Sequence, residues 1–257
     1  MTGVALALHQ YRYDQRTFWR EPASVFFTVV LPLIFLFLFV SIFGDEDVAR
    51  GGAEVGFATY YLPGILTLSL ISATFVNLAI SLTIWRERGE LKRMRATPVP
   101  VWVVIAGRTL TAAGVSAVMV VVVTAIGALL YGVDVPTTTL PAVLLALVVG
   151  VAAGSALGFA FASVVPSENA AAPMSNAIVL PLYFISGIFI PSDQTPEWMQ
   201  TVANVFPIKA LFEALLTGFD PNTSGAGFAF GQVGIVALWG VAGAVFAIKR
   251  FRWTPRG

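Results

Sequence analysis

The sequence predicts an all-α integral membrane protein, and composition, the length of its apolar runs and the placement of its charges each support this fold class. Of the 257 residues, 57% are hydrophobic and only 11% are charged, and the mean hydropathy is +0.83. A soluble domain is ordinarily about 45–50% apolar and about 25% charged. One soluble core cannot hide this much apolar surface. The single histidine, His9, and the lack of cysteine exclude disulfides, thiolate metal sites and histidine clusters.

Six apolar runs are long enough to cross a bilayer as helices. The hydrocarbon layer is about 30 Å thick and a helix rises about 1.5 Å per residue, so about 20 residues suffice. The predicted spans are residues 23–43, 58–84, 101–131, 140–165, 170–190 and 229–248. Backbone polar groups in lipid must be satisfied within each segment, which favours helices over the alternating strands of a barrel. The whole chain, 1–257, is therefore predicted to form one transmembrane domain.

The basic residues predict the orientation of these spans. They concentrate before the first span, between the second and third, and after the sixth, and basic loops stay on the cytoplasmic side. The loops on the opposite side are mainly acidic, as in the stretch from Asp45 to Asp47. Both termini are therefore predicted in the cytoplasm, which an even number of crossings allows. Arg108, about two turns into the third span, is expected to extend its side chain back to the cytoplasmic surface.

Residues 1–22 are predicted to form an amphipathic helix that lies in the cytoplasmic headgroup layer. At 100° per residue, apolar and polar side chains separate onto two sides of such a helix. The apolar side consists of Val4, Leu8, Tyr11 and Phe18. The polar side consists of His9, Arg12, Arg16 and Arg20. Cations on one side and apolar groups on the other are typical of a helix at a membrane surface.

Groups that carry ion coupling or catalysis are missing from the predicted spans. Their interiors contain no Asp or Glu, which argues against a proton- or sodium-driven carrier. There is no carboxylate pair, second histidine or cysteine for an intramembrane hydrolase. Neutral polar residues that could face a central path and contact a substrate are Thr74, Asn77, Ser81, Ser175 and Asn176. Hydrogen bonding between helices is the alternative, and the commoner, role for such residues.

The loop from Trp85 to Pro100, WRERGELKRMRATPVP, is the most informative segment. Leu91 and Met94 lie three residues apart, on one face of a short helix within a charged collar. An apolar knob of this kind suits docking into a groove of a soluble partner, and the prolines set where the helix stops. A positively charged retention loop with no partner is the alternative. No phosphate-binding G-x-x-x-x-G-K-[ST] loop is present, so ATP would have to be bound by another subunit.

Two motifs resemble those of permeases of the type-2 ABC exporter class, which include drug-resistance and antibiotic-export permeases. The run from Glu87 to Pro98, ERGELKRMRATP, is similar to the signature E-[KR]-G-x-[LF]-[KR]-[RK]-[LM]-[RK]-x-[TS]-P after the second span. The stretch from Ser186 to Pro207 resembles the motif s-G-x-x-f-P … P-x-W … x-P, which leads into an extracellular re-entrant hairpin. With the six spans and the amphipathic start, the resemblance covers essentially the whole chain.

The resemblance implies roles for both motifs. The first would be a coupling helix seated on an ATPase, which the N-terminal helix would also abut. Its coupling residues would be Glu87, Arg88, Gly89, Glu90, Leu91, Arg93, Met94, Arg95 and Pro98. The extracellular gate would include Gly187, Phe189, Pro191, Trp198 and Pro207. Two permease chains, identical or paralogous, would combine with two ATPase chains that bind ATP and Mg, and this chain would hold no cofactor.

Two further patterns concern helix packing. The run from Trp198 to Phe219 is too apolar for an exposed loop and is broken by Pro207, which predicts two half-helices that dip toward the membrane from the outer segment 191–228. A surface linker is the alternative. The glycines Gly150, Gly154 and Gly158 predict close approach of another helix of the same chain, with dimerisation as the alternative.

The expected function is therefore that of a permease subunit in the plasma membrane. It would export a lipophilic drug-like or lipid-like substrate from the cytoplasm or inner leaflet, because a path without buried charge suits apolar cargo better than a polyanion. The permease would not itself be an enzyme, whereas the complete complex would hydrolyse ATP. An ATP-independent channel or carrier and a membrane scaffold subunit remain as alternatives. Nothing in the sequence points to nucleic acid.

Overall fold

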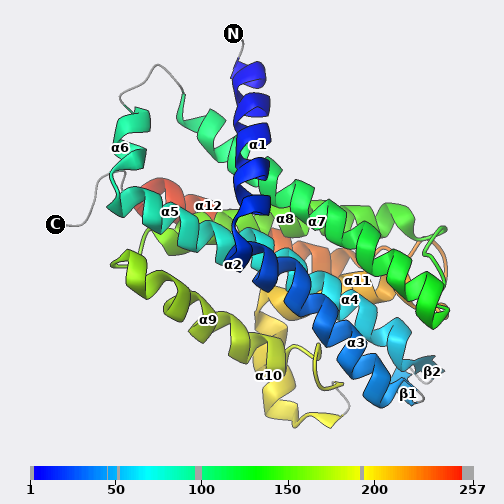
Figure 1. Ribbon diagram of the computed structural model, residues 1–257. Helices are drawn as coiled ribbons and strands as arrows, with labels where there is room; N and C mark the ends of the chain where they lie inside the picture. The colour runs from blue at the N-terminus through cyan, green and yellow to red at the C-terminus, as the bar shows by residue number, and fades with distance from the viewer. Residues whose placement is uncertain (1–2, 45, 51–52, 96–99, 192–193, 251–257) are drawn as a thin grey trace.

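Long helices lie side by side in the computed structural model, which describes residues 3–44, 46–50, 53–95, 100–191 and 194–250. Helix α1 (Gly3–Arg20) crosses the bundle near the end that carries the short helix α6 (Glu90–Arg95). A small hairpin of strands β1 and β2 lies at the opposite end (Figure 1). The two ends of the bundle therefore differ in structure as well as in charge.

The first predicted span is a broken helix over Pro22–Phe43. It consists of α2 (Pro22–Val25), the π-turn η1 (Phe26–Val30) and α3 (Leu31–Phe43). In the π-turn, the N–H of Leu31 bonds to the carbonyl of Phe26, five residues back. Pro32 follows immediately and has no N–H to donate, which loosens the preceding turn and explains the wider spacing.

The second predicted span is a continuous helical rod over Phe57–Glu87, and it is the most buried of the candidate spans. It consists of α4 (Phe57–Ile71), the π-turn η2 (Ser72–Val76) and α5 (Asn77–Glu87). The Thr74 hydroxyl lies within the π-turn and donates to the carbonyl of Leu70 at 2.7 Å. A side chain that competes for a backbone acceptor in this way disturbs the helical ladder locally.

Three more predicted spans are single helices with nearly the expected bounds. They are α7 (Val101–Tyr131), α8 (Leu140–Ala162) and α12 (Phe230–Arg250). The backbones of α8 and α12 are in direct contact, since a β-carbon added to Gly240 would lie 2.9 Å from the Cα of Ala153. Pairs of this kind need glycine at the contact.

The predicted glycine seam on α8 packs against the same chain. A β-carbon on Gly150 would lie 2.9 Å from a methyl carbon of Leu211, and one on Gly158 would lie 2.9 Å from the Thr74 carbonyl oxygen. One on Gly154 would collide with the Thr74 hydroxyl. The prediction of an intrachain neighbour is confirmed, because η2 and α11 occupy this face of α8.

Helix α9 (Glu168–Ile185) corresponds to the fifth predicted span but is less apolar than the others. Among the described residues, five helices are long and apolar enough to cross a membrane, and α9 is not one of them. Its first half carries Glu168, Asn169, Ser175 and Asn176. In Figure 1 it runs along the bundle beside α5, as a crossing helix would, and its crossing remains a prediction.

The outer segment contains the two half-helices that the sequence predicts. α10 (Glu197–Val205) and α11 (Pro207–Phe219) meet at a bend of 94°. Pro207 occupies the first turn of α11, where its missing N–H has no intrahelical partner to lose. α11 is almost entirely buried against α4, α8 and α12, which explains why its sequence is too apolar for a surface loop. The depth of this hairpin in a membrane stays a prediction.

The antiparallel hairpin of β1 (Asp47–Arg50) and β2 (Ala53–Gly56) is an addition to the predicted all-α fold. Val48 lies opposite Val55, and both are buried. The sequence predicts only an acidic loop here, because strands of four residues each are too short to show a clear alternation. Burial of the two valines on one face stabilises the pairing.

Candidate functional site

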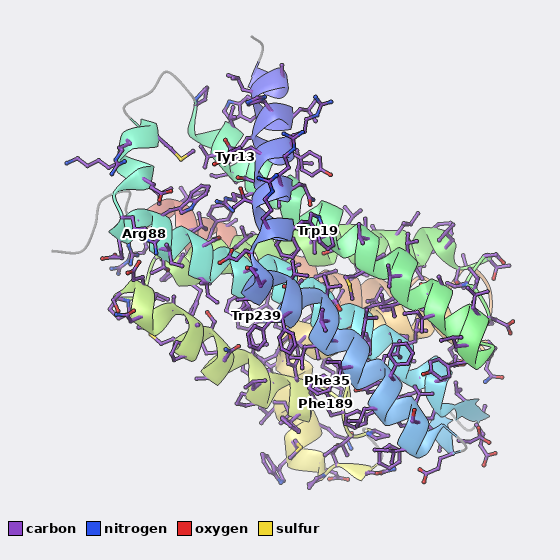
Figure 2. The ribbon with its side chains drawn as sticks, in the orientation of Figure 1. Tyr13, Trp19, Phe35, Arg88, Phe189 and Trp239 are labelled. Atoms are coloured by element: carbon purple, nitrogen blue, oxygen red, sulfur yellow. The ribbon has the colours of Figure 1, made fainter. Side chains whose placement is uncertain are left out.

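The predicted loop helix is present as α6, which follows α5 after a tight turn. Gly89 has φ of +72°, in the left-handed region that favours glycine, and its carbonyl accepts the N–H of Arg93 at 3.1 Å. Arg88 and Arg93 are exposed, and Glu87 and Glu90 are partly buried. Figure 2 shows Arg88 at this end of the bundle. The Arg95 side chain and Pro98 lie outside the described residues.

Leu91 does not form the exposed apolar knob that the sequence pattern predicts. Its side chain is fully buried, and Met94 is half-buried. The turn at Gly89 folds α6 back so that its apolar side faces the protein, where it is removed from water. The outward surface of α6 is cationic instead, with Lys92 and Arg93 exposed. Any partner of this loop would meet positive charge first.

A buried arginine connects the start of this loop to the turn between α8 and α9. Arg86, at the end of α5, is only 1% exposed. Its guanidinium donates to the carbonyls of Ala162 and Val165, each at 2.7 Å, and to the Glu87 carboxylate at 2.9 Å. Ala162 is the last residue of α8, where carbonyls have no intrahelical donor, and Val165 follows it in the turn. Arg86 therefore closes the end of α8 with a charged, planar donor.

A second, exposed ion pair joins the same two segments. The Arg88 guanidinium lies 3.4 Å from the Glu168 carboxylate at the start of α9. An exposed pair of this geometry contributes little to stability by itself. Together with the buried Arg86, it shows that the loop and the α8–α9 turn form one connected surface.

The third feature of this end is a buried charge cluster that holds α1 against α7. The Arg108 guanidinium of α7 lies 3.4 Å from the Asp14 carboxylate of α1. It also stacks over Trp85, with its guanidinium carbon 3.4 Å from the ring centroid. Gln10 donates to the same carboxylate at 3.0 Å. Arg108 is 8% exposed and pairs within the protein, so the expectation that it extends to the surface is wrong.

Burial has a clear electrostatic effect on this cluster. It raises the pKa of the Asp14 carboxyl above its ordinary value, while Arg108 and, to a smaller extent, Gln10 lower it. The two charges reduce each other's cost of burial, and that is the physical reason that a carboxylate can lie on the inner side of α1.

Helix α1 separates its two sides largely as predicted. His9, Arg12, Arg16 and Arg20 are all exposed. On the other side Phe18 is buried and Tyr11 half-buried, but Leu8 is exposed, and the Val4 side chain lies outside the described residues. The inner side packs along the first half of α7, since a β-carbon on Gly107 would collide with Gln10. Tyr13 and Trp19 project outward (Figure 2), and the position of this helix at a membrane surface stays a prediction.

The predicted gate residues differ in their surroundings. The Phe189 ring lies 5.6 Å from that of Phe35, centroid to centroid, and the two are adjacent in Figure 2. The carbonyl of Gly187 accepts the hydroxyl of Tyr60 at 2.8 Å. Pro191 is buried, and Trp198 is 64% exposed and lies outside this aromatic cluster as far as the described residues show. A gating role for these residues stays a prediction.

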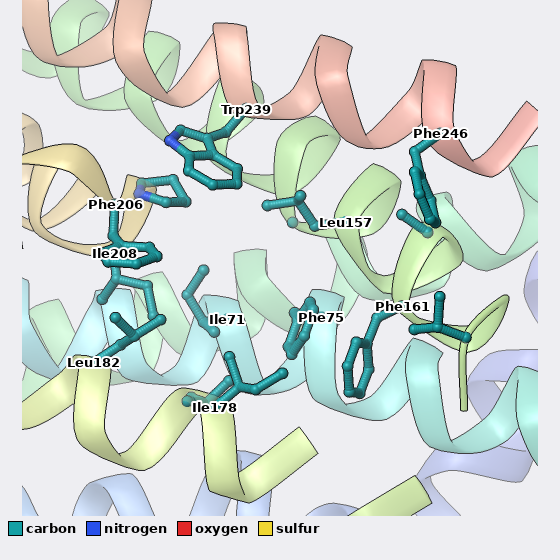
Figure 3. Close-up of a pocket in the computed structure, with 15 residues that line it drawn as sticks. Ile71, Phe75, Leu157, Phe161, Ile178, Leu182, Phe206, Ile208, Trp239 and Phe246 are labelled. Carbon is teal, nitrogen blue, oxygen red and sulfur yellow. The ribbon is translucent and has the colours of Figure 1, made fainter. Parts of the chain in front are cut away.

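A cavity of about 280 Å³ lies among η2, α8, α9, α12 and the bend between α10 and α11. Figure 3 shows Phe75, Phe161, Ile178 and Trp239 around it, with Phe206 and Ile208 at one end. Its walls are Ile71, Phe75, Gly154, Leu157, Ala160, Phe161, Val164, Ile178, Val179, Leu182, Phe206, Pro207, Ile208, Trp239 and Phe246. The cavity lies within one chain, and its walls are almost entirely apolar.

The polar residues predicted for a substrate path do not line this cavity, as far as the structure describes its walls. Thr74 and Ser175 are buried and donate to carbonyls of their own helices, and Ser81 does so at 3.4 Å. Asn77 is half-buried and Asn176 is exposed on α9. The three hydroxyls are therefore hydrogen-bonded within their own helices in this conformation. Substrate contact by any of the five stays a prediction.

Sequence reasoning missed three residues that organise these sites. Asp14 is the single acidic residue of α1 and precedes Phe18 by four residues, so the two lie on the same side of the helix. Because Phe18 is on the apolar side, this position indicates a carboxylate that faces the protein. Arg86 precedes the coupling motif, but its acceptors are 76 and 79 residues away in the chain. Trp239 donates to the Val205 carbonyl at 2.7 Å, and no local pattern indicates that contact.

The long apolar helices of the described residues define a multi-pass membrane protein. The chain belongs to the ABC-2 type transporter family, whose model matches residues 11–219. It is similar to the daunorubicin resistance ABC transporter permease protein DrrB1 of Streptomyces coeruleorubidus, with 29% identity over 210 residues, 80% of this chain and 72% of that protein. It is also similar to the inner membrane transport permease YadH of Escherichia coli K12, with 24% identity over 219 residues, 82% of this chain and 85% of the relative.

Proposed function

We propose that this chain is the transmembrane subunit of an exporter driven by a separate ABC ATPase. The observation that carries the proposal is the contact of Arg86 with Ala162 and Val165, because it ties the cytoplasmic loop to the helices that follow it. A displacement of α6 would be transmitted through the end of α5 to the α8–α9 turn. An ATPase bound on the cytoplasmic side needs such a connection to move the helices that lie within the membrane.

The proposed assembly has two permease chains, identical or paralogous, and two ATPase chains. ATP and Mg would bind to the ATPase chains, and the permease would contribute no nucleotide site. The basic loop and the last turn of α12, which carries Lys249 and Arg250, support a location in the plasma membrane with both termini in the cytoplasm.

The proposed cargo is lipophilic, drug-like or lipid-like. The apolar walls of the cavity support this class, and so do the interiors of the five candidate spans, where the only carboxylate is that of Glu87 at the end of the second. A charged cargo would have no partner within them. Daunorubicin resistance is a property of one relative, and that drug is not assigned to this chain. A measured preference for a polyanionic cargo would contradict this part of the proposal.

Co-purification of the chain with its candidate ATPase is the direct test of coupling. Arg93→Glu reverses an exposed charge on α6 and is expected to release the ATPase, whereas Arg250→Glu reverses an exposed charge at the end of α12 and is the matched control. Release by both variants would indicate a general charge effect. Capture of no ATPase by the wild type, with transport by the purified chain alone, would favour the ATP-independent carrier.

A further inference from the structure

The apolar cavity has walls that cannot recognise a polar ligand. Its one conspicuous polar group, the indole N–H of Trp239, already donates to the Val205 carbonyl at 2.7 Å. The indole ring also stacks on Phe206, with centroids 5.9 Å apart. Because a polar group placed against such walls would lose its hydrogen bonds to water without replacement, only an uncharged apolar group is stable there.

The cavity has a deep part and a mouth. Ile71, Val179 and Ile208 are 3–6% exposed and form the deep walls. Ile178 on α9 and Phe246 on α12 are each 43% exposed, so they stand at the surface while lining the same space. The mouth therefore opens between α9 and α12, on a side of the bundle that would face hydrocarbon in a bilayer.

The volume limits what can enter. Apolar cavities of about 150 Å³ lined by Leu, Ile and Phe stay dry and bind benzene, and pockets for drug-sized ligands begin at about 300 Å³. At about 280 Å³ this cavity exceeds the first size and falls just below the second. A segment of a flexible hydrocarbon chain fits these limits better than a whole drug-sized molecule.

We propose that this cavity binds one hydrocarbon chain, such as the fatty-acyl chain of a lipid, which enters between α9 and α12. The bound chain ends against Phe206 and Pro207, at the 94° bend of the outer hairpin. Occupancy of the cavity thereby contacts the element that covers the outer side of the bundle. This proposal does not depend on ATPase coupling, because it concerns binding by the chain alone.

Photolabelling of the full chain in nanodiscs tests the proposal. The probe is a phosphatidylcholine with a diazirine in one acyl chain, and labelled residues are mapped by mass spectrometry. Ordinary contact with the bilayer labels outward residues such as Val121, which is 68% exposed. A bound chain is expected to label the deep walls as well, at Ile71 or Ile208. Labelling confined to outward residues, with this probe and with the second probe described below, would overturn the proposal.

A matched pair of substitutions on α9 separates the cavity from the lipid surface. Ile178→Trp places an indole in the mouth, whereas Leu180→Trp places one on the outer surface of the same helix, where the side chain is 51% exposed and lines no part of the cavity. Exclusion of about two methylene groups of the bound chain lowers the binding constant about tenfold. Deep labelling should fall by up to this factor in Ile178→Trp and persist in Leu180→Trp. Equal labelling in the two variants would also overturn the proposal.

A second probe distinguishes the source of the chain. A long-chain alcohol with the same diazirine is added to nanodiscs that contain unlabelled lipid. Deep labelling by the phospholipid assigns the site to a membrane lipid, and deep labelling by the alcohol alone assigns it to the apolar part of another ligand, such as cargo. Either result supports a hydrocarbon-chain site, and deep labelling by neither probe rejects it.

Discussion

The guanidinium of Arg86 donates a hydrogen bond of 2.7 Å to the carbonyl of Ala162, so the end of α5 is fastened to the end of α8. The residues are far apart in sequence, and neither contact atom reaches solvent freely. A bond from a charged donor to an otherwise unpartnered carbonyl is among the stronger polar interactions in a protein. Separating these helix ends would leave the carbonyl and the charge without partners.

Arg86→Ala should lower the free energy of unfolding by about 3 kcal/mol, because bonds from charged donors contribute about 1.5–3 kcal/mol each. Arg86→Lys keeps the charge but lacks the two-pronged donor, so it should recover only part of the loss. Thermal unfolding in detergent measures both. In the proposed exporter complex, Arg86→Lys should still hold the ATPase while transport per ATP falls. Unchanged transport per ATP would contradict a transmitting role for Arg86.

The pair of Asp14 and Arg108 should show strong energetic coupling. Asp14→Asn leaves a buried guanidinium without its counter-charge, a change that costs about 3–5 kcal/mol in other proteins. Arg108→Gln should be destabilising for the converse reason. The double variant Asp14→Asn/Arg108→Gln should lose clearly less stability than the sum of the losses of the two single variants. Additive losses in thermal unfolding would show that the charges do not act as a pair.

Gly154→Ala should destabilise the protein by about 1–3 kcal/mol, the usual cost of overpacking. The added methyl group would collide with the Thr74 hydroxyl and force η2 away from α8. Gly234→Ala is the matched control, because that glycine is also in a helix and has open space around its β-carbon position. Melting temperatures of the two variants provide the comparison. Equal values would mean that the contact between Gly154 and Thr74 has room for a methyl group.

Trp239→Phe should weaken the bend between α10 and α11 by about 1 kcal/mol, the typical net worth of one hydrogen bond. The variant loses the bond to the Val205 carbonyl and can keep the stacking on Phe206. Trp239→Ala removes both and should cost more. Thermal unfolding of the wild type, Trp239→Phe and Trp239→Ala measures their relative stability. A Trp239→Phe variant as stable as the wild type would mean that stacking alone holds the bend.

The helices were largely predictable because lipid imposes long apolar runs. α7 and α12 were predicted within two residues at each end, and the break before Pro207 followed from the missing N–H of proline. Burial of Leu91 was not predictable, since it depends on the left-handed turn at Gly89, which local periodicity does not contain. The contacts of Arg86 and Asp14 are tertiary, so only the packed structure shows them.

The glycine contact between α8 and α12 also determines where this protein can change shape. Backbones that touch at Gly240 and Ala153 cannot slide without collision, so the two helices behave as one rigid body. α9 has its main contacts with α5, α10, α11 and η2 instead. Hinge and shear displacements are therefore directed to the borders of the α8–α12 body, and α9 is one of the helices outside this body that can move against it.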